Sequence, residues 1–166
     1  MNKNKIYLIG LAGSGKTKVG KILAERLNFK FIDINTEIEK NALMFLDEIV
    51  NHYGEKTINN AEIDILSKLN DDNIVVACND GIVNTRGNKK LLDGIVIYLD
   101  VDNKILEKRL EEEYPKVSYQ DISVADLAQK RFLLYRDFAT HIISNNSNDI
   151  IKTVDSILDI LQINKY

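Results

Sequence analysis

The segment Gly10-Leu-Ala-Gly13-Ser14-Gly15-Lys16-Thr17 has the spacing G-x-x-x-x-G-K-[ST] of a phosphate-binding loop, or P-loop. Its glycines allow the backbone to turn so tightly that successive N–H groups converge on phosphate oxygens, and the following helix adds the positive end of its dipole. Lys16 would neutralise the β- and γ-phosphates, and the Thr17 hydroxyl would bind Mg²⁺. A glycine-rich turn that binds nothing is the alternative, but in a chain this long the four fixed positions arise by chance less than about one time in a hundred. The residues expected to bind a nucleotide are therefore Gly13, Ser14, Gly15, Lys16 and Thr17.

A carboxylate stands near the end of the next strand-like segment, Phe29–Ile34. In a parallel sheet the carboxyl ends of the strands meet at one edge, beside the phosphate-binding loop, and ligands bind there. Asp33 could hold the water shell of Mg²⁺ or orient an acceptor hydroxyl. The alternative is that Asp33 only caps the next helix, a role that Thr36 could fill in a capping box with Glu39. The position at the end of a strand favours the metal and acceptor roles.

The rest of the chain alternates between short apolar runs and amphipathic stretches. Strands are expected at Lys5–Gly10, Phe29–Ile34, Ile74–Cys78, Ile95–Leu99 and, more weakly, His141–Ser144. Helices are expected at Gly15–Leu27, Thr36–His52, Thr57–Leu69, Asn88–Leu92, Asn103–Glu113, Ser123–Phe138 and Asn148–Leu161. Strands separated by helices predict a parallel sheet that is covered by helices on both faces.

Composition limits the classes of protein that fit. The chain has 166 residues, of which 45% are apolar and 28% charged, as in one folded domain with a substantial core. It has no apolar stretch near the roughly 20 residues of a membrane-spanning helix, and its first residues do not form a signal-peptide core. A single cysteine, Cys78, excludes an internal disulfide and a cysteine-based zinc site. The net charge of −3 gives no basic face for nucleic acid. We expect a cytoplasmic protein with small-molecule partners, no nucleic-acid or membrane partner, and a monomer by default.

The chain resembles the shikimate kinase family along nearly its whole length. The segments that carry the resemblance are Ile9–Gly20, Phe31–Asp33, Asp47–Ile49, Gly54-Glu55, Glu62, Asn88–Leu92, Val96–Asp100 and Lys130–Tyr135. The resemblance implies one P-loop kinase domain over 1–166, a three-layer α/β/α fold with a five-stranded parallel sheet in the order 2-3-1-4-5. It also implies an acceptor-binding helical segment at about 34–70 and a mobile lid at about 112–123. The implied reaction transfers the γ-phosphoryl group of ATP to a hydroxyl of shikimate or a related polyol, with Mg²⁺.

The same resemblance assigns roles on the nucleotide side. Arg109 falls where the family has an arginine that stacks on the base, and a guanidinium plane suits the face of adenine. An exposed helical arginine paired with Glu112 or Glu113 is an equally good interpretation. The polar loop after the last strand corresponds to the adenine-contacting loop of the family, with Asn145 as its candidate. In the lid, Lys116 is the best stand-in for a family arginine, so that the catalytic candidates are Lys16, Asp33 and Lys116.

The departures from the family lie on the acceptor side. Asn35 stands where a second aspartate contacts acceptor hydroxyls, and Asn59 stands where an arginine pairs with the acceptor carboxylate. A run of three glycines is replaced by Asn79-Asp80-Gly81, and Asp80 would repel an anionic acceptor. Arg131, the second carboxylate-binding arginine by position, is retained. The acceptor-binding candidates are Asn35, Asn59, Asp80, Gly81 and Arg131.

Two functions of different classes are compatible with this pattern. The first is an ATP-dependent small-molecule kinase, in which Asp33 or Asp80 orients the acceptor hydroxyl. The second is a nucleotide-binding paralogue with lost or altered acceptor specificity and a regulatory role, which Asn35, Asn59 and the lost glycine run would explain. Another P-loop kinase, for gluconate or nucleoside monophosphates, fits the segment before Glu62 less well.

Overall fold

The computed structural model describes residues 4–113 and 122–163. The strands are β1 Lys5–Ile9, β2 Lys30–Asp33, β3 Ile74–Ala77, β4 Ile95–Asp100 and β5 His141–Ser144. The α-helices are α1 Lys16–Leu27, α2 Ile34–Ala42, α3 Leu46–Tyr53, α4 Glu55–Ser67, α5 Asn103–Glu113, α6 Val124–Phe138 and α7 Ile150–Ile163. Two 3₁₀-helices, η1 Asp80–Asn84 and η2 Arg86–Leu91, connect β3 to β4.

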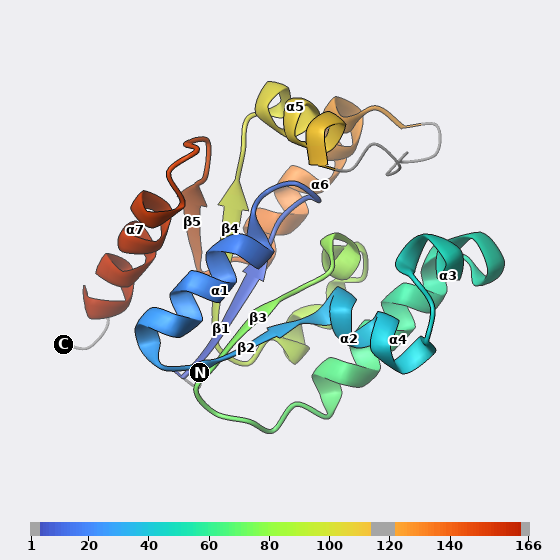
Figure 1. Ribbon diagram of the computed structural model, residues 1–166, viewed down its shortest axis with the longest axis horizontal. Helices are drawn as coiled ribbons and strands as arrows, with labels where there is room; N and C mark the ends of the chain where they lie inside the picture. Colours follow the sequence, from blue (N-terminus) through green and yellow to red (C-terminus); the bar gives the residue numbers. More distant parts are fainter. Residues whose placement is uncertain (1–3, 114–121, 164–166) are drawn as a thin grey trace.

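The five strands form one parallel sheet in the order β2-β3-β1-β4-β5 (Figure 1). This order confirms the predicted fold class. The first strand lies in the centre of the sheet, so the loop that follows it opens at the middle of the carboxyl edge. Asp33 and Leu8 both pair with Ala77 of β3, from opposite sides. The register therefore brings the end of β2 level with the end of β1, where the P-loop begins.

Helices cover both faces of the sheet, as the alternating pattern predicts. Successive residues of β1 point to opposite faces, so Ile6 and Leu8 pack with α1 and α7, whereas Tyr7 and Ile9 face the other helices. On the first face the buried partners are Val19, Leu23, Val154 and Ile157. On the second they include Ile38, Ile49, Ile58, Leu127 and Tyr135, from α2, α3, α4 and α6. Figure 1 shows α1 and α7 side by side on one face of the three-layer arrangement.

The prediction of one continuous helix over Thr36–His52 is wrong. The helix α2 ends at Ala42, and Leu43 adopts the left-handed region at φ 53° while its N–H bonds to the carbonyl of Glu39. A new helix, α3, begins at Leu46. A non-glycine residue rarely adopts a positive φ, so the leucine gave no sign of the break.

The predicted capping box of Thr36 and Glu39 is also wrong. The N-cap of α2 is Asp33, whose Oδ1 accepts a hydrogen bond from the Thr36 N–H at 3.2 Å. The Glu39 carboxylate instead accepts the N–H of Leu46 at 3.0 Å and so helps to begin α3. Both donors belong to first turns of helices, whose N–H groups have no partner within the helix.

The other differences lie between β3 and β4 and at element ends. The 3₁₀-helix η1 was not predicted, and Asn79 caps it by accepting the Gly81 N–H on its side-chain oxygen at 2.9 Å. The short helix expected at Asn88–Leu92 is the 3₁₀-helix η2. The segment of about 34–70 expected to bind the acceptor forms α2, α3 and α4. Most of the lid segment, Lys116 included, lies outside the described residues.

Candidate active site

The P-loop connects β1 to α1 at the centre of the sheet. Gly10, Gly13 and Gly15 all have positive φ angles, of 149°, 82° and 96°. Gly15 is also the N-cap of α1, and a Cβ there would lie 2.5 Å from the Asn145 amide nitrogen. Only glycine combines this backbone angle with so close a neighbour. The loop therefore has the conformation for which its glycine spacing is suited.

Lys16 is the first residue of α1, and its ammonium group reaches back across the loop. Its Nζ donates to the carbonyl oxygens of Gly10 at 2.7 Å and Leu11 at 3.0 Å. Burial lowers the pKa of Lys16, and the negative charges of Asp80 and Asp33 oppose this change. A phosphate chain beside the ammonium would favour its charged form, because an opposite charge stabilises it.

Thr17 and Asp33 meet at the entrance of the loop. The Thr17 hydroxyl donates to Oδ2 of Asp33 at 2.6 Å, while Oδ1 of the same carboxylate caps α2. The structure therefore shows the capping role of Asp33, and its role toward Mg²⁺ or an acceptor stays a prediction. Oxygen ligands of this kind suit Mg²⁺, which binds to one or two protein groups together with substrate phosphates. In the part of the chain that the structure describes, no group of three or more acidic, histidine or cysteine side chains could hold a metal alone. Phosphate oxygens and water would complete the coordination shell.

Arg109 of α5 joins the P-loop to the loop between β5 and α7. Its guanidinium donates to the carbonyls of Gly13 at 3.2 Å and Asn145 at 2.8 Å. The alternative role expected for Arg109 was an ion pair with Glu112 or Glu113. Glu112 pairs with Lys108, at 3.9 Å. Arg109 thus holds two loops of the nucleotide side together, and its stacking on a base stays a prediction.

Asn145 supports the P-loop from below. It is 3% exposed, and its amide nitrogen donates to the Ser14 carbonyl at 2.7 Å. Its amide oxygen accepts the Thr153 hydroxyl at 2.6 Å. Both polar atoms of the side chain are therefore engaged within the protein. The structure shows that Asn145 supports the P-loop. Its contact with adenine stays a prediction.

A wall of polar side chains runs from Asp33 along the carboxyl ends of β2 and β3, with Asn79 at its centre. The Asn79 side chain donates to Asn35 Oδ1 at 2.9 Å and accepts the Gly81 N–H at 2.9 Å. A Cβ on Gly81 would lie 3.0 Å from Asn59 Oδ1, so Asn59 belongs to the same cluster. The structure thus brings three of the five predicted acceptor residues together around an asparagine that was not among them. We call Asn35, Asn59, Asn79, Asp80 and Gly81 the acceptor wall.

Glu62 lies behind this wall and is almost fully buried, at 1% exposed. Its Oε1 accepts the Asn79 backbone N–H at 2.7 Å, whereas Oε2 has no partner among the described residues. Burial raises the pKa of Glu62 to about 8, because a charged carboxylate loses its hydration there. Sequence reasoning did not count Glu62 as a site residue. One sequence feature could have identified it: Glu62 lies on the same face of α4 as the buried residues Ile58 and Leu66, at a spacing of four.

The remaining two predicted acceptor residues form an ion pair. Asp80 Oδ2 lies 3.0 Å from Arg131 Nη1, with the two side chains 19% and 8% exposed. Burial alone would lower the pKa of Arg131, but the charge of Asp80 and the contacts with Tyr135 together raise it. The Tyr135 hydroxyl donates to the Asp80 carbonyl at 2.6 Å, and its ring stacks on Tyr98 at a centroid distance of 5.0 Å.

Comparison with known proteins agrees with this arrangement. Residues 12–162 match the family model described as shikimate kinase. The chain belongs to the shikimate kinase family. It is 33% identical over 160 residues to shikimate kinase of Rippkaea orientalis, covering 93% of this chain and 86% of that protein. Shikimate kinase 2 of Pectobacterium atrosepticum is 31% identical over 162 residues, or 92% and 91% of the two chains.

Solved structures of shikimate kinases have the same fold. Shikimate kinase from Acinetobacter baumannii in complex with shikimate superposes with a TM-score of 0.91 at 29% identity, covering 98% of this chain and 95% of that one. A gluconokinase from Sinorhizobium meliloti 1021, at 16% identity and a TM-score of 0.64, shares the fold alone. Shikimate kinases are ATP-dependent phosphotransferases with an alcohol acceptor, so the expected class of enzyme is confirmed. The regulatory paralogue is not favoured by these findings.

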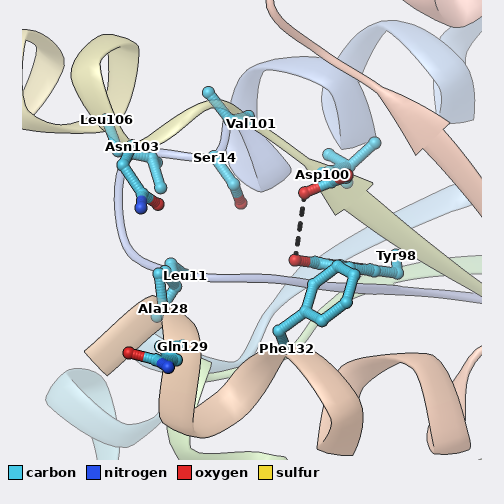
Figure 2. A pocket seen from close by; sticks show the side chains of 11 residues that line it. Leu11, Ser14, Tyr98, Asp100, Val101, Asn103, Leu106, Ala128, Gln129 and Phe132 are labelled. Carbon is cyan, nitrogen blue, oxygen red and sulfur yellow. Dashed lines mark hydrogen bonds between the residues drawn. The ribbon is translucent and has the colours of Figure 1, made fainter. Parts of the chain in front are cut away.

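A pocket of about 200 Å³ lies between the P-loop, the end of β4, α5 and α6 (Figure 2). Ser14 is 1% exposed, its hydroxyl points into this space, and it has no hydrogen-bond partner among the described residues. On the opposite side the Tyr98 hydroxyl donates to Asp100 at 3.2 Å. The residues that line the pocket are Leu11, Ser14, Tyr98, Leu99, Asp100, Val101, Asn103, Leu106, Ala128, Gln129 and Phe132. None of them belongs to the acceptor wall, so the pocket is separate from the predicted acceptor site.

Proposed function

We propose that this shikimate kinase family member transfers the γ-phosphoryl group of ATP to a hydroxyl of shikimate or a related polyol, with Mg²⁺. The observation that carries the proposal is the 2.6 Å contact between Thr17 and Asp33. It joins the phosphate-binding loop to the end of β2, and it supports the proposal because two oxygens of a kind that suits Mg²⁺ lie together there. Family membership supplies the class of reaction.

On the nucleotide side, the protein's task is positioning and neutralisation of charge, because phosphoryl transfer requires little covalent chemistry from the enzyme. Lys16 and the loop N–H groups hold the phosphates, and Thr17 with Asp33 holds the Mg²⁺ ion. When bound, the ion neutralises charge on the phosphate oxygens. Arg109 and the loop of Asn145 border the adenine. Lys116, which lies outside the described residues, screens the transferring group and excludes water.

On the acceptor side, Asn35, Asn59, Asp80, Gly81 and Arg131 bind the acceptor. Asp33 orients the reacting hydroxyl, since it lies beside the P-loop while Asp80 is paired with Arg131. We further propose that the protein acts as a cytoplasmic monomer. We also propose that it has no nucleic-acid partner, because its net charge of −3 gives no basic face. Among the described residues, no helix has the length and apolar character to cross a membrane.

An ADP-release assay over a panel of hydroxylated metabolites, beginning with shikimate, tests the proposal. We expect turnover that depends on the acceptor and on Mg²⁺. Calorimetric binding of Mg-ATP, measured in parallel, shows whether the nucleotide site is competent. Tight Mg-ATP binding without acceptor-dependent turnover by any member of the panel would contradict the proposal.

A further inference from the structure

The Asp80–Arg131 pair stands at the far end of the acceptor wall. Asn35 follows Asp33 by two residues and bonds to Asn79, and Asp80 follows Asn79 directly. The side chains of the acceptor wall therefore connect the Thr17–Asp33 contact to Arg131 through Asn35, Asn79 and Asp80. An acceptor whose hydroxyl lies at Asp33 would extend along these side chains toward the ion pair.

The position of Asp80 is fixed from two sides. Arg131 Nη1 contacts its carboxylate at 3.0 Å and its carbonyl oxygen at 3.4 Å. The Tyr135 hydroxyl, one helical turn further along α6, holds the same carbonyl at 2.6 Å. With 8% of its side chain exposed, Arg131 is largely closed off from water as well. The guanidinium thus has an anionic partner that belongs to the protein itself.

This pairing decides which ligand groups the wall can attract. A ligand carboxylate binds strongly when it meets a guanidinium whose charge is free to pair with it. Here it would meet Asp80 on the same guanidinium, and two like charges so close repel one another. The other side chains of the wall are the amides Asn35, Asn59 and Asn79. Amides donate and accept hydrogen bonds without charge and suit hydroxyl groups.

We propose that Asp80 is a specificity-determining residue that, by occupying Arg131, makes the site select hydroxylated acceptors without a carboxylate over those that carry one. The inference rests on the proposed function, because it takes the acceptor wall as the acceptor site. It narrows the substrate class to neutral polyols and cyclic polyhydroxylated compounds. Specificity then depends on repulsion of ligand carboxylates as well as on hydrogen bonds to ligand hydroxyls.

The test compares shikimate with its methyl ester, which lacks the negative charge and carries one additional methyl group. Their dissociation constants are measured by calorimetry on the full chain, in the presence of a nonhydrolysable ATP analogue and Mg²⁺. We expect the wild type to bind the ester at least tenfold more tightly than the acid. In Asp80→Asn the amide can still accept from Arg131, and the ratio should shift by at least tenfold toward the acid.

Asp137→Asn is the matched control. Asp137 also lies on α6 and pairs with Lys89 at 3.7 Å, with 43% of its side chain exposed. Its replacement removes the same charge without touching Arg131, so the ligand ratio should stay within twofold of the wild type. If Asp80→Asn fails to fold, as thermal unfolding would reveal, the wild-type comparison alone still decides.

Three results would overturn the inference, and the first two are a wild type that prefers the acid and a ratio that is the same in wild type and Asp80→Asn. Either can occur while acceptor-dependent ADP release persists, so the inference can fail without the proposed function. Failure of both ligands to bind any of these proteins would overturn the inference. Absence of turnover with every acceptor, despite the expected shift in binding ratio, would contradict only the proposed function.

Discussion

The two sides of the active site are built in different ways. On the nucleotide side, the central groups come from one continuous segment, and backbone geometry places them. On the acceptor side, the contacts join residues far apart in the chain: Asn79 to Glu62 across 17 positions, Asn35 to Asn79 across 44 and Arg131 to Asp80 across 51. A local backbone motif tolerates few substitutions, whereas a set of long-range side-chain contacts can be rebuilt one residue at a time. This difference explains how the family's phosphate site can persist beside an altered acceptor site.

The largest effect is expected at the centre of the nucleotide side. Replacing Lys16 by Ala removes the ammonium that bridges the loop, and we expect the rate of ATP-dependent transfer to fall about a thousandfold or more. The fold should remain, because Lys16 makes its two side-chain bonds within the loop alone. Steady-state ADP release and circular dichroism measure the two quantities. Lys21→Ala, an exposed lysine on the same helix, is the control. An unchanged rate in Lys16→Ala would remove the mechanism proposed for this side.

The next prediction separates the two roles of Asp33. Asparagine is as good an N-cap as aspartate, so Asp33→Asn keeps the cap of α2 while it removes the charge beside Thr17. We expect the rate to fall about a hundredfold, as for loss of a single preorganised electrostatic contact, and the Mg²⁺ concentration for half-maximal rate to rise. The melting temperature should change little. A variant with wild-type Mg²⁺ dependence would show that Asp33 is only a cap.

Local sequence patterns predict much of the nucleotide side. They do not predict its contacts between residues that are far apart in the chain. The glycine spacing predicted the loop, and the position at a strand end predicted that Asp33 would lie beside it. In contrast, the bond between Asn145 and Ser14 joins residues 131 positions apart, and no spacing rule reports it. The same applies to Thr153, whose hydroxyl completes this contact. Pattern analysis finds residues near the loop, but which buried amide supports it is decided by packing.

For the acceptor side, sequence reasoning named candidate residues but did not predict the contacts between them. Sequence reasoning assigned Asn35, Asp80 and Arg131 to the acceptor site because of a resemblance, and it predicts that Asp80 disfavours an anion. It did not foresee that Asp80 would pair with Arg131, since a helix after the lid and a turn after β3 have no local relation. It also missed Asn79, although an asparagine before a glycine-containing turn is a frequent cap. The order of the strands and the covering of both faces by helices, by comparison, were predicted correctly, although one expected helix is the pair α2 and α3.

A third prediction tests the support beneath the P-loop. Asn145→Ala leaves the Ser14 carbonyl and the Thr153 hydroxyl without their buried partners, which costs about 2–3 kcal/mol of the free energy of unfolding. Urea denaturation measures this loss, and we expect the KM for ATP to rise about tenfold with it, since one such hydrogen bond is worth about 1 kcal/mol. Thr153→Val removes only the second contact and should cost less. Equal losses for the two variants would contradict the idea that the Ser14 contact positions the loop.

The last prediction concerns Glu62, behind the acceptor wall. Its pKa is raised from 4.5 to about 8 by burial, so between these values the folded protein keeps a proton that the unfolded chain releases. The unfolded state then binds fewer protons, and the free energy of unfolding falls as pH rises through this window, by about 1.4 kcal/mol per pH unit from this group. Below about pH 4.5 the contribution is fully present, and above about pH 8 it is lost.

Glu62→Gln is the matched substitution, because its amide oxygen can still accept the Asn79 N–H and it cannot ionise. The free energy of unfolding is measured with urea at half-unit steps from pH 5 to pH 8, and it should change less with pH in this variant than in the wild type. Glu107→Gln, which replaces an exposed carboxylate on α5, should retain the wild-type slope. Equal slopes for all three proteins would mean that Glu62 is ionised in the fold. In that case the acceptor wall would carry a buried negative charge behind Asn79, which would add to the repulsion of anionic acceptors by Asp80.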